Sequence, residues 1–161
     1  MTKYLPFIAC FISLSLWGAQ ELNVLVQMTV PPLQNLELSQ NSLNMPESKT
    51  EDFDRGYIDF PDALTLNISS NVPWKVLVHT EDLTLTNRNP PKPLADLLWK
   101  RSKRNRYRAL RNKTRRVARS QNPVFDRKID LDFRVLLDWV DDSPGNYQTT
   151  LIFTVAGNDV P

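Results

Sequence analysis

The stretch IDLDFRVLLDW, residues 129–139, decides the expected fold of this 161-residue chain. Its apolar and polar side chains alternate, which places six apolar residues on one side of an extended backbone. Because successive side chains of a strand point to opposite faces, the pattern predicts a strand with one buried face. The buried set would be Ile129, Leu131, Phe133, Val135, Leu137 and Trp139.

The residues that follow predict a hairpin. Residues 141–146 are DDSPGN, and this combination of Asp, Ser, Pro, Gly and Asn is typical of a turn. Residues 147–155, YQTTLIFTV, are rich in β-branched and aromatic side chains, which favour strands. We therefore expect two antiparallel strands joined by this turn.

Shorter stretches upstream extend the alternating pattern over the chain. Residues 39–55 are polar and lack periodicity, which indicates a loop. Several short strands with turn signals and few helical windows predict an all-β fold, specifically an antiparallel sandwich. The further alternating stretches are residues 22–30, 64–69 and 74–79.

The N-terminus predicts export. Residues 5–16, LPFIACFISLSL, form an apolar run after Lys3, and the small residues Gly18 and Ala19 follow. The run is shorter than the roughly 20 residues that span a bilayer. These features predict a secretory signal peptide over residues 1–19.

The mature protein would then be residues 20–161, a single sandwich domain in the periplasm, at the cell surface or in the extracellular space. It would not be an integral membrane protein. A lipoprotein lipidated at Cys10 and an uncleaved membrane anchor remain alternatives. If cleavage occurs near residue 20, the mature chain has no Cys and therefore no disulfide.

Between Lys100 and Arg119 the chain has eleven basic residues and no acidic one. The whole chain has 20 basic and 18 acidic residues, so without these eleven and Lys3 the remainder has 8 basic against 18 acidic residues. Such an asymmetry predicts an anionic partner. The candidate anion- or partner-binding residues are Lys100, Arg101, Lys103, Arg104, Arg106, Arg108, Arg111, Lys113, Arg115, Arg116 and Arg119.

The conformation of this basic stretch, an insertion at residues 94–122, is ambiguous. The stretch from Leu94 to Asn122 contains no Pro or Gly, and its Ala, Leu, Arg and Lys residues favour a helix. Apolar residues near Trp99 and Tyr107 alternate equally well as two strands of a hairpin.

Two short motifs resemble a known class of protein. Ser70, Asn71 and Trp74 form an SN-x-x-W pattern, and residues 142–147 form a D-x-P-G-x-Y pattern that includes Tyr147. With their flanking strands they resemble secreted bacterial surface proteins of immunoglobulin-like β-sandwich fold, namely fimbrial subunits and spore-coat-U-like proteins. The resemblance covers about half of the mature chain.

The resemblance implies structural roles and favours the hairpin. Trp74 would anchor the core, and Tyr147 would act as a tyrosine corner whose hydroxyl bonds upstream backbone. Residues 93–101 and 107–110 would be the two arms of a hairpin. The role implied for the protein is that of a surface subunit that assembles through protein–protein contacts.

Catalytic patterns are absent from the sequence. The single histidine, His79, lies on the outward side of a predicted strand, and four Gly residues form no phosphate-binding loop. Asp138, Asp141 and Asp142 indicate a polar turn, or alternatively a Ca²⁺ site, which would need six or more oxygen ligands. We expect no enzyme activity, no catalytic residue, no metal, no cofactor and no small-molecule substrate.

The acidic residues suggest where the basic segment binds. Asp130, Asp132 and Asp138 share the outward face of one predicted strand with Arg134 between them. They would protect an edge or surface strand, or form an acidic patch that meets the basic segment of a neighbouring molecule.

We therefore predict an exported, non-enzymatic, fimbria-like structural subunit whose partners are other protein subunits. The alternative is a monomeric module that binds an anionic envelope polymer or a nucleic acid through the basic segment. The segment could also fold back onto the protein's own acidic face. Residues 22–30 would pair within their own molecule or be donated to a neighbour, and self-pairing is favoured.

Overall fold

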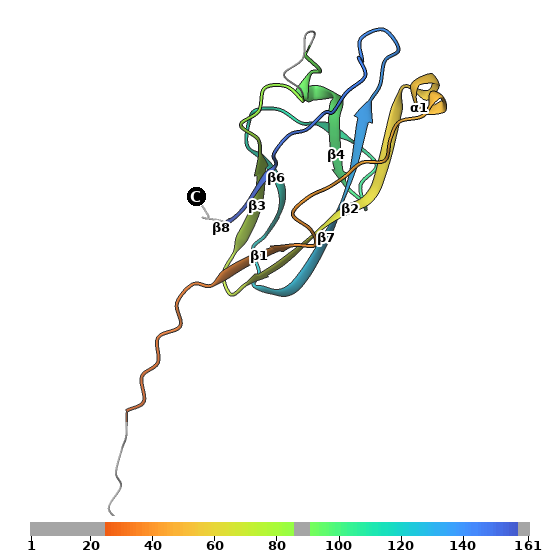
Figure 1. Ribbon diagram of the computed structural model, residues 1–161. Coiled ribbons are helices and arrows are strands. Elements are labelled where there is room, and N and C mark those ends of the chain that lie inside the picture. The colour runs from red at the N-terminus through yellow and green to blue at the C-terminus, as the bar shows by residue number, and fades with distance from the viewer. Residues whose placement is uncertain (1–24, 86–90, 158–161) are drawn as a thin grey trace, which may run out of the picture. The chain divides into compact units, whose positions relative to one another are not determined.

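Two antiparallel β-sheets dominate the computed structural model, which describes residues 25–85 and 91–157 (Figure 1). The chain divides into two units, residues 1–30 and 31–161. In the first unit, residues 25–30 form no regular secondary structure. The predicted strand 22–30 is therefore wrong for residues 25–30, while its first three residues and the predicted signal peptide, 1–19, lie outside the described residues.

The second unit contains all of the described strands. The five-stranded sheet has the order β1-β2-β7-β4-β5, and the three-stranded sheet has the order β6-β3-β8. The strands of the first sheet are β1 (Gln34–Leu38), β2 (Tyr57–Ser70), β7 (Val124–Leu136), β4 (Leu97–Arg101) and β5 (Arg108–Ala109). Those of the second are β6 (Arg115–Ser120), β3 (Trp74–His79) and β8 (Ile152–Gly157).

The two sheets share one hydrophobic core. Leu66 and Ile68 of β2 and Val76 of β3 are fully buried, and Leu131 of β7 is 1% exposed. All four belong to one cluster of packed apolar side chains drawn from both sheets. The predicted all-β sandwich is thus confirmed, and so are the inward faces of the predicted strands at 64–69 and 74–79.

The strand at residues 129–139 is confirmed in part. Ile129, Leu131 and Phe133 are buried as predicted. The strand begins earlier, at Val124, and ends at Leu136. Trp139 is 59% exposed beyond the end of the strand.

The predicted hairpin of this strand with residues 147–155 is wrong. β7 lies in the five-stranded sheet, and β8 pairs with β3 in the other sheet. β2 and β4 occupy both sides of β7, so no hydrogen-bonding edge is left for β8. The DDSPGN turn therefore carries the chain from one sheet to the other.

The predicted loop at residues 39–55 contains a short helix, α1 (Thr50–Arg55). The Asp52 carboxylate accepts the backbone N–H of Lys49 at 3.0 Å, which caps the first turn. Gly56 ends the helix at φ +81°, a left-handed conformation that glycine adopts without strain. A helix of six residues has fewer than two turns, which is too short to give a periodic pattern.

The basic stretch forms a hairpin. β4 and β5 pair antiparallel with Leu98 opposite Ala109, which confirms the hairpin in preference to a helix. The only helical turn in the stretch, as far as the structure describes it, is the 3-10 turn η1 (Leu94–Asp96). Because β6 also comes from this stretch, it supplies strands to both sheets.

Among the described residues, no helix has the length and apolar character needed to cross a membrane.

Candidate functional site

The eleven basic residues between Lys100 and Arg119 lie on β4, on the edge strands β5 and β6 and in the loops that join them, and we call this surface the basic edge. β5 is the outermost strand of the five-stranded sheet and β6 that of the three-stranded sheet. Only residues 110–114 separate these strands, so the two edges lie close together. Nine of the eleven side chains are exposed, and Lys100 and Arg101 are half-buried. Charges along an edge discourage further strand pairing there.

Three guanidinium groups of this region are close enough to that of Arg101 to repel it. Burial lowers the pKa of Arg101, and repulsion from Arg104, Arg108 and Arg127 lowers it further. None of these four arginines forms an ion pair with the described residues, since the ion pairs found there involve other side chains. We call them the Arg101 cluster. An electropositive group of this kind favours a bound anion.

Arg127 is a member of this cluster that sequence reasoning missed. It lies on β7, outside the basic segment, and only the pairing of β7 with β4 brings it near Arg101. No linear pattern links two residues so far apart in the chain.

Lys100 has an internal counter-ion. Its ammonium lies 3.0 Å from the Asp132 carboxylate, whose side chain is 8% exposed. That carboxylate also accepts the Ser102 hydroxyl and, at 2.9 Å, the backbone N–H of Asp62. Burial alone would raise the pKa of Asp132, but these donors outweigh it and hold the pKa below its ordinary value.

The predicted role of the acidic residues as edge protection is wrong. Asp130 and Asp132 lie on β7, a strand with neighbours on both sides, and Asp132 is buried. The Asp130 carboxylate accepts the Thr65 hydroxyl at 2.8 Å. Both carboxylates therefore bind neighbours within the sheet, while Asp138 lies beyond the end of the strand.

Arg134 is enclosed by two tyrosine rings and a carboxylate. Its guanidinium carbon lies 3.8 Å from the ring centre of Tyr57 and 4.4 Å from that of Tyr107. Two of its nitrogens bind the two oxygens of Asp59 at 2.6 and 2.8 Å. The Tyr107 hydroxyl donates to Asp59 at 3.2 Å, and the Lys100 ammonium lies 5.0 Å from the Tyr107 ring centre.

The residues of this group, which we call the Arg134 cluster, shift one another's pKa values. The Arg134 hydrogen bonds lower the pKa of Asp59, and the same bonds raise the pKa of Arg134. Burial, followed by the Asp59 charge and hydrogen bond, raises the pKa of Tyr107 to about 12. The Tyr107 ring already contacts two cations, so it is not a free surface on which a nucleic-acid base could stack.

The three residues predicted to be structural have different environments. Trp74 is 3% exposed in the core, as expected for an anchor. Trp139 is not a core residue: its ring packs on Phe53 at 4.8 Å, and its indole N–H donates to Asp54 at 3.1 Å. Tyr147 lies before β8, and its hydroxyl donates to the Ser143 carbonyl oxygen, the kind of bond expected of a tyrosine corner.

Asp138, Asp141 and Asp142 lie in a turn that is held by hydrogen bonds and an ion pair. The Asp138 carboxylate accepts the backbone N–H groups of Val140 and Asp141, and these bonds lower the pKa of Asp138. The Asp142 carboxylate binds the buried ammonium of Lys92. In the described part of the chain, no group of His, Cys, Asp and Glu side chains is arranged to hold a metal ion.

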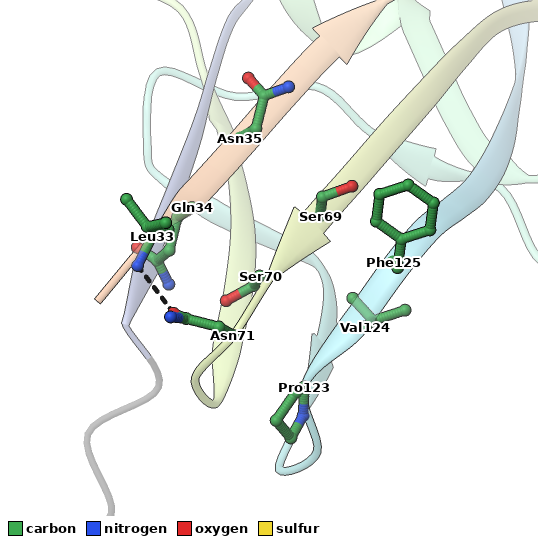
Figure 2. Close-up of a pocket in the computed structure, with 9 residues that line it drawn as sticks. All are labelled: Leu33, Gln34, Asn35, Ser69, Ser70, Asn71, Pro123, Val124 and Phe125. Atoms are coloured by element: carbon green, nitrogen blue, oxygen red, sulfur yellow. Dashed lines mark hydrogen bonds between the residues drawn. The ribbon is translucent and has the colours of Figure 1, made fainter. Parts of the chain in front are cut away.

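A shallow groove of about 610 Å³ lies at the opposite end of β2 from α1 (Figure 2). It is lined by the start of β1, the end of β2 and the start of β7, and Val124 and Phe125 form one wall. Asn71 fixes its rim by accepting the Leu33 N–H at 2.7 Å and donating to the Pro31 carbonyl at 2.9 Å. No ionisable side chain lines it, so it is suited to apolar contact rather than to chemistry.

No protein-family model matches this chain, and no curated protein shows a significant sequence match to it.

Proposed function

We propose that the protein is an exported, non-enzymatic surface subunit that assembles with further copies through residues 25–30. One observation supports this proposal most strongly. Leu25, Val26, Met28 and Val30 are 63–85% exposed and belong to no strand. Exposed apolar side chains in an alternating segment favour pairing with another protein edge. The predicted signal peptide supports export.

The edge of β8 is the best acceptor for such a segment. In the described residues β8 pairs with β3 on one side and with no strand on the other. Its sequence, IFTVAG, carries no charge, whereas the edges formed by β5 and β6 carry arginines that oppose pairing. Backbone hydrogen bonds would give affinity, and alternate apolar side chains would set the register.

The test compares two triple variants of the mature protein. Replacing Val26, Met28 and Val30 by Ser removes one apolar side of the segment, and we expect loss of assembly in size-exclusion chromatography with light scattering and in electron microscopy. The matched control replaces Leu25, Gln27 and Thr29 by Ser on the other side and should still assemble. A wild-type protein that stays monomeric at all concentrations contradicts the proposal.

A second pair of variants tests the acceptor. Thr154 is exposed on β8, and Thr154→Lys places a charge on the edge, which should block assembly. Gln148→Lys adds the same charge outside the strand and should not. Equal behaviour of the two variants would exclude β8 as the acceptor.

The Arg101 cluster supports a second candidate function: binding of a phosphate-bearing envelope polymer. Four guanidinium groups without carboxylate partners suit bidentate contacts to phosphate. Binding to long-chain polyphosphate should weaken steeply as salt increases. Replacing Arg104, Arg108 and Arg127 by Gln should weaken binding more than the control, in which Lys103, Lys113 and Arg119 become Gln. Equal losses of binding in the two triple variants would indicate an effect of overall charge and not a specific site.

A further inference from the structure

Lys92 is a buried lysine held against two carboxylates. Its side chain is 3% exposed, and its Nζ lies 2.5 and 2.7 Å from the two carboxylate oxygens of Asp142. A second carboxylate, that of Asp96, lies 3.3 Å from the same nitrogen. The Asp142 side chain is 5% exposed, and that of Asp96 is 28% exposed.

The surrounding structure holds both partners in place. The Lys92 carbonyl accepts the Leu85 N–H at 2.9 Å, which fixes the backbone that carries the lysine. The Asp142 carboxylate accepts the Asp138 N–H at 2.9 Å. The Tyr147 ring centre lies 5.9 Å from Nζ, on the same turn as Asp142. Neither the position of the amine nor that of the acid depends on the ion pair alone.

The amine and the carboxyl group are held in contact. Nζ lies within hydrogen-bond distance of both oxygens of Asp142, as in a bidentate ion pair, so attack requires the amine to move out of the carboxylate plane towards Cγ. Holding two reactants in contact replaces a bimolecular step by an intramolecular one, which lowers the barrier.

We propose that Lys92 and Asp142 condense to an intramolecular isopeptide bond. In this reaction Asp96 transfers a proton from Nζ to the departing hydroxyl group. The reaction begins when one proton passes from the Lys92 ammonium to the Asp142 carboxylate. The products of this transfer are a neutral amine and a neutral acid.

The amine lone pair then attacks Cγ of Asp142, and the carbonyl electron pair moves onto oxygen. Asp96 accepts a proton from Nζ and delivers it to the departing hydroxyl group. The C–O bond breaks, one water molecule leaves, and an Nζ–Cγ amide remains. The step needs no oxidant, reductant or cofactor, and Asp96 ends in its starting state.

The bond would join two segments 50 residues apart, the approach to β4 and the turn that carries the chain between the sheets. Closing a long loop covalently restricts the unfolded chain, as a disulfide does. This crosslink does not depend on the assembly proposed above.

Intact-mass spectrometry of the purified mature protein tests the proposal. We expect a mass lower than the sequence mass by one water molecule, and a proteolytic digest in which the peptides containing Lys92 and Asp142 stay joined. An aspartyl succinimide also loses water, but it joins no peptides. Lys92→Met and Asp142→Ala should both have the full mass.

Asp96→Asn is the decisive variant because it leaves the Lys92–Asp142 pair in place. It should fold, as judged by circular dichroism, and keep the full mass, whereas Asp141→Asn should lose water like the wild type. A folded wild-type protein with the full mass and no joined peptide after prolonged incubation overturns the proposal. A crosslink that forms equally well in Asp96→Asn overturns the role given to Asp96.

Discussion

Trp74 and Trp139 both carry an indole ring, but only the ring of Trp74 is enclosed by the core. Trp74 is 3% exposed and its indole nitrogen has no hydrogen-bond partner in the described structure. Trp139 is 59% exposed, its ring packs on that of Phe53, and its indole N–H donates to the Asp54 carboxylate. Burial, and not residue type, therefore sets what each contributes to stability.

Trp74→Ala should lower the free energy of unfolding by about 3–5 kcal/mol, because it leaves a cavity in the core. Trp74→Phe should have a much smaller effect, since the lost N–H makes no hydrogen bond. Trp139→Ala is the control and should lower stability by about 1 kcal/mol. Urea unfolding measures all three, and equal losses for the two Ala variants would contradict the burial argument.

At the scale of the element, β4 joins the sheet through its pairing with β7, and side-chain contacts attach the loop that follows it. Tyr107, in the loop before β5, reaches Asp59 of β2, and Arg134 of β7 lies between them. The hairpin itself has only two residue pairs in register. Two pairs of residues provide little stability alone, so the Arg134 cluster and the hydrogen bonds of Ser102 to β7 attach the loop between β4 and β5.

The phenol of Tyr107 should ionise at about pH 12, compared with about 10 for an ordinary tyrosine. Ultraviolet absorbance measures this as the difference between the wild type and Tyr107→Phe. Asp59→Asn should lower the pKa only part of the way, because burial is the largest cause of its rise.

The sign of the stability effect follows from the raised pKa. The fold favours the neutral phenol, so its stabilisation is complete below about pH 10 and is lost as the pH rises towards the folded-state value. Tyr107→Phe should therefore show a weaker loss of stability than the wild type over this interval. Simultaneous ionisation of all tyrosines near pH 10 in folded protein would contradict the expected shift.

At the scale of the molecule, some basic side chains have carboxylate partners and others lie among like charges. On β7, Arg134 is enclosed by Asp59 and two rings, while Arg127 lies among like charges. The chain thus neutralises part of its positive charge internally, through Lys100 and Arg134, and leaves the Arg101 cluster without counter-ions in the described residues. A surface of this kind favours an external anion.

These two arginines of one strand make a matched pair. Arg127→Gln should leave the free energy of unfolding unchanged or raise it by a few tenths of a kcal/mol, since it relieves repulsion. Arg134→Gln should lower it by about 1 kcal/mol, a value reduced because the Asp59 side chain is 39% exposed. Thermal unfolding at low and high salt measures both. Destabilisation by Arg127→Gln would contradict the repulsion.

The sequence by itself determined the local features of this protein. Alternation in residues 64–69, 74–79 and 129–133 identified the strands and their buried sides, because the two-residue repeat of a strand is a property of the local backbone. The alternation around Trp99 and Tyr107 fitted a hairpin and a helix equally well, and only the resemblance to known surface proteins favoured the hairpin that the structure contains.

Only the tertiary structure decided which strands pair and which charges meet. β7 and β8 are joined by a good turn sequence, yet they lie in different sheets because β2 and β4 already fill both edges of β7. The packing of segments distant in the chain likewise brings Arg127 to Arg101 and Lys92 to Asp142. Contacts of this kind depend on segments distant in the chain, and no short pattern of residues encodes them.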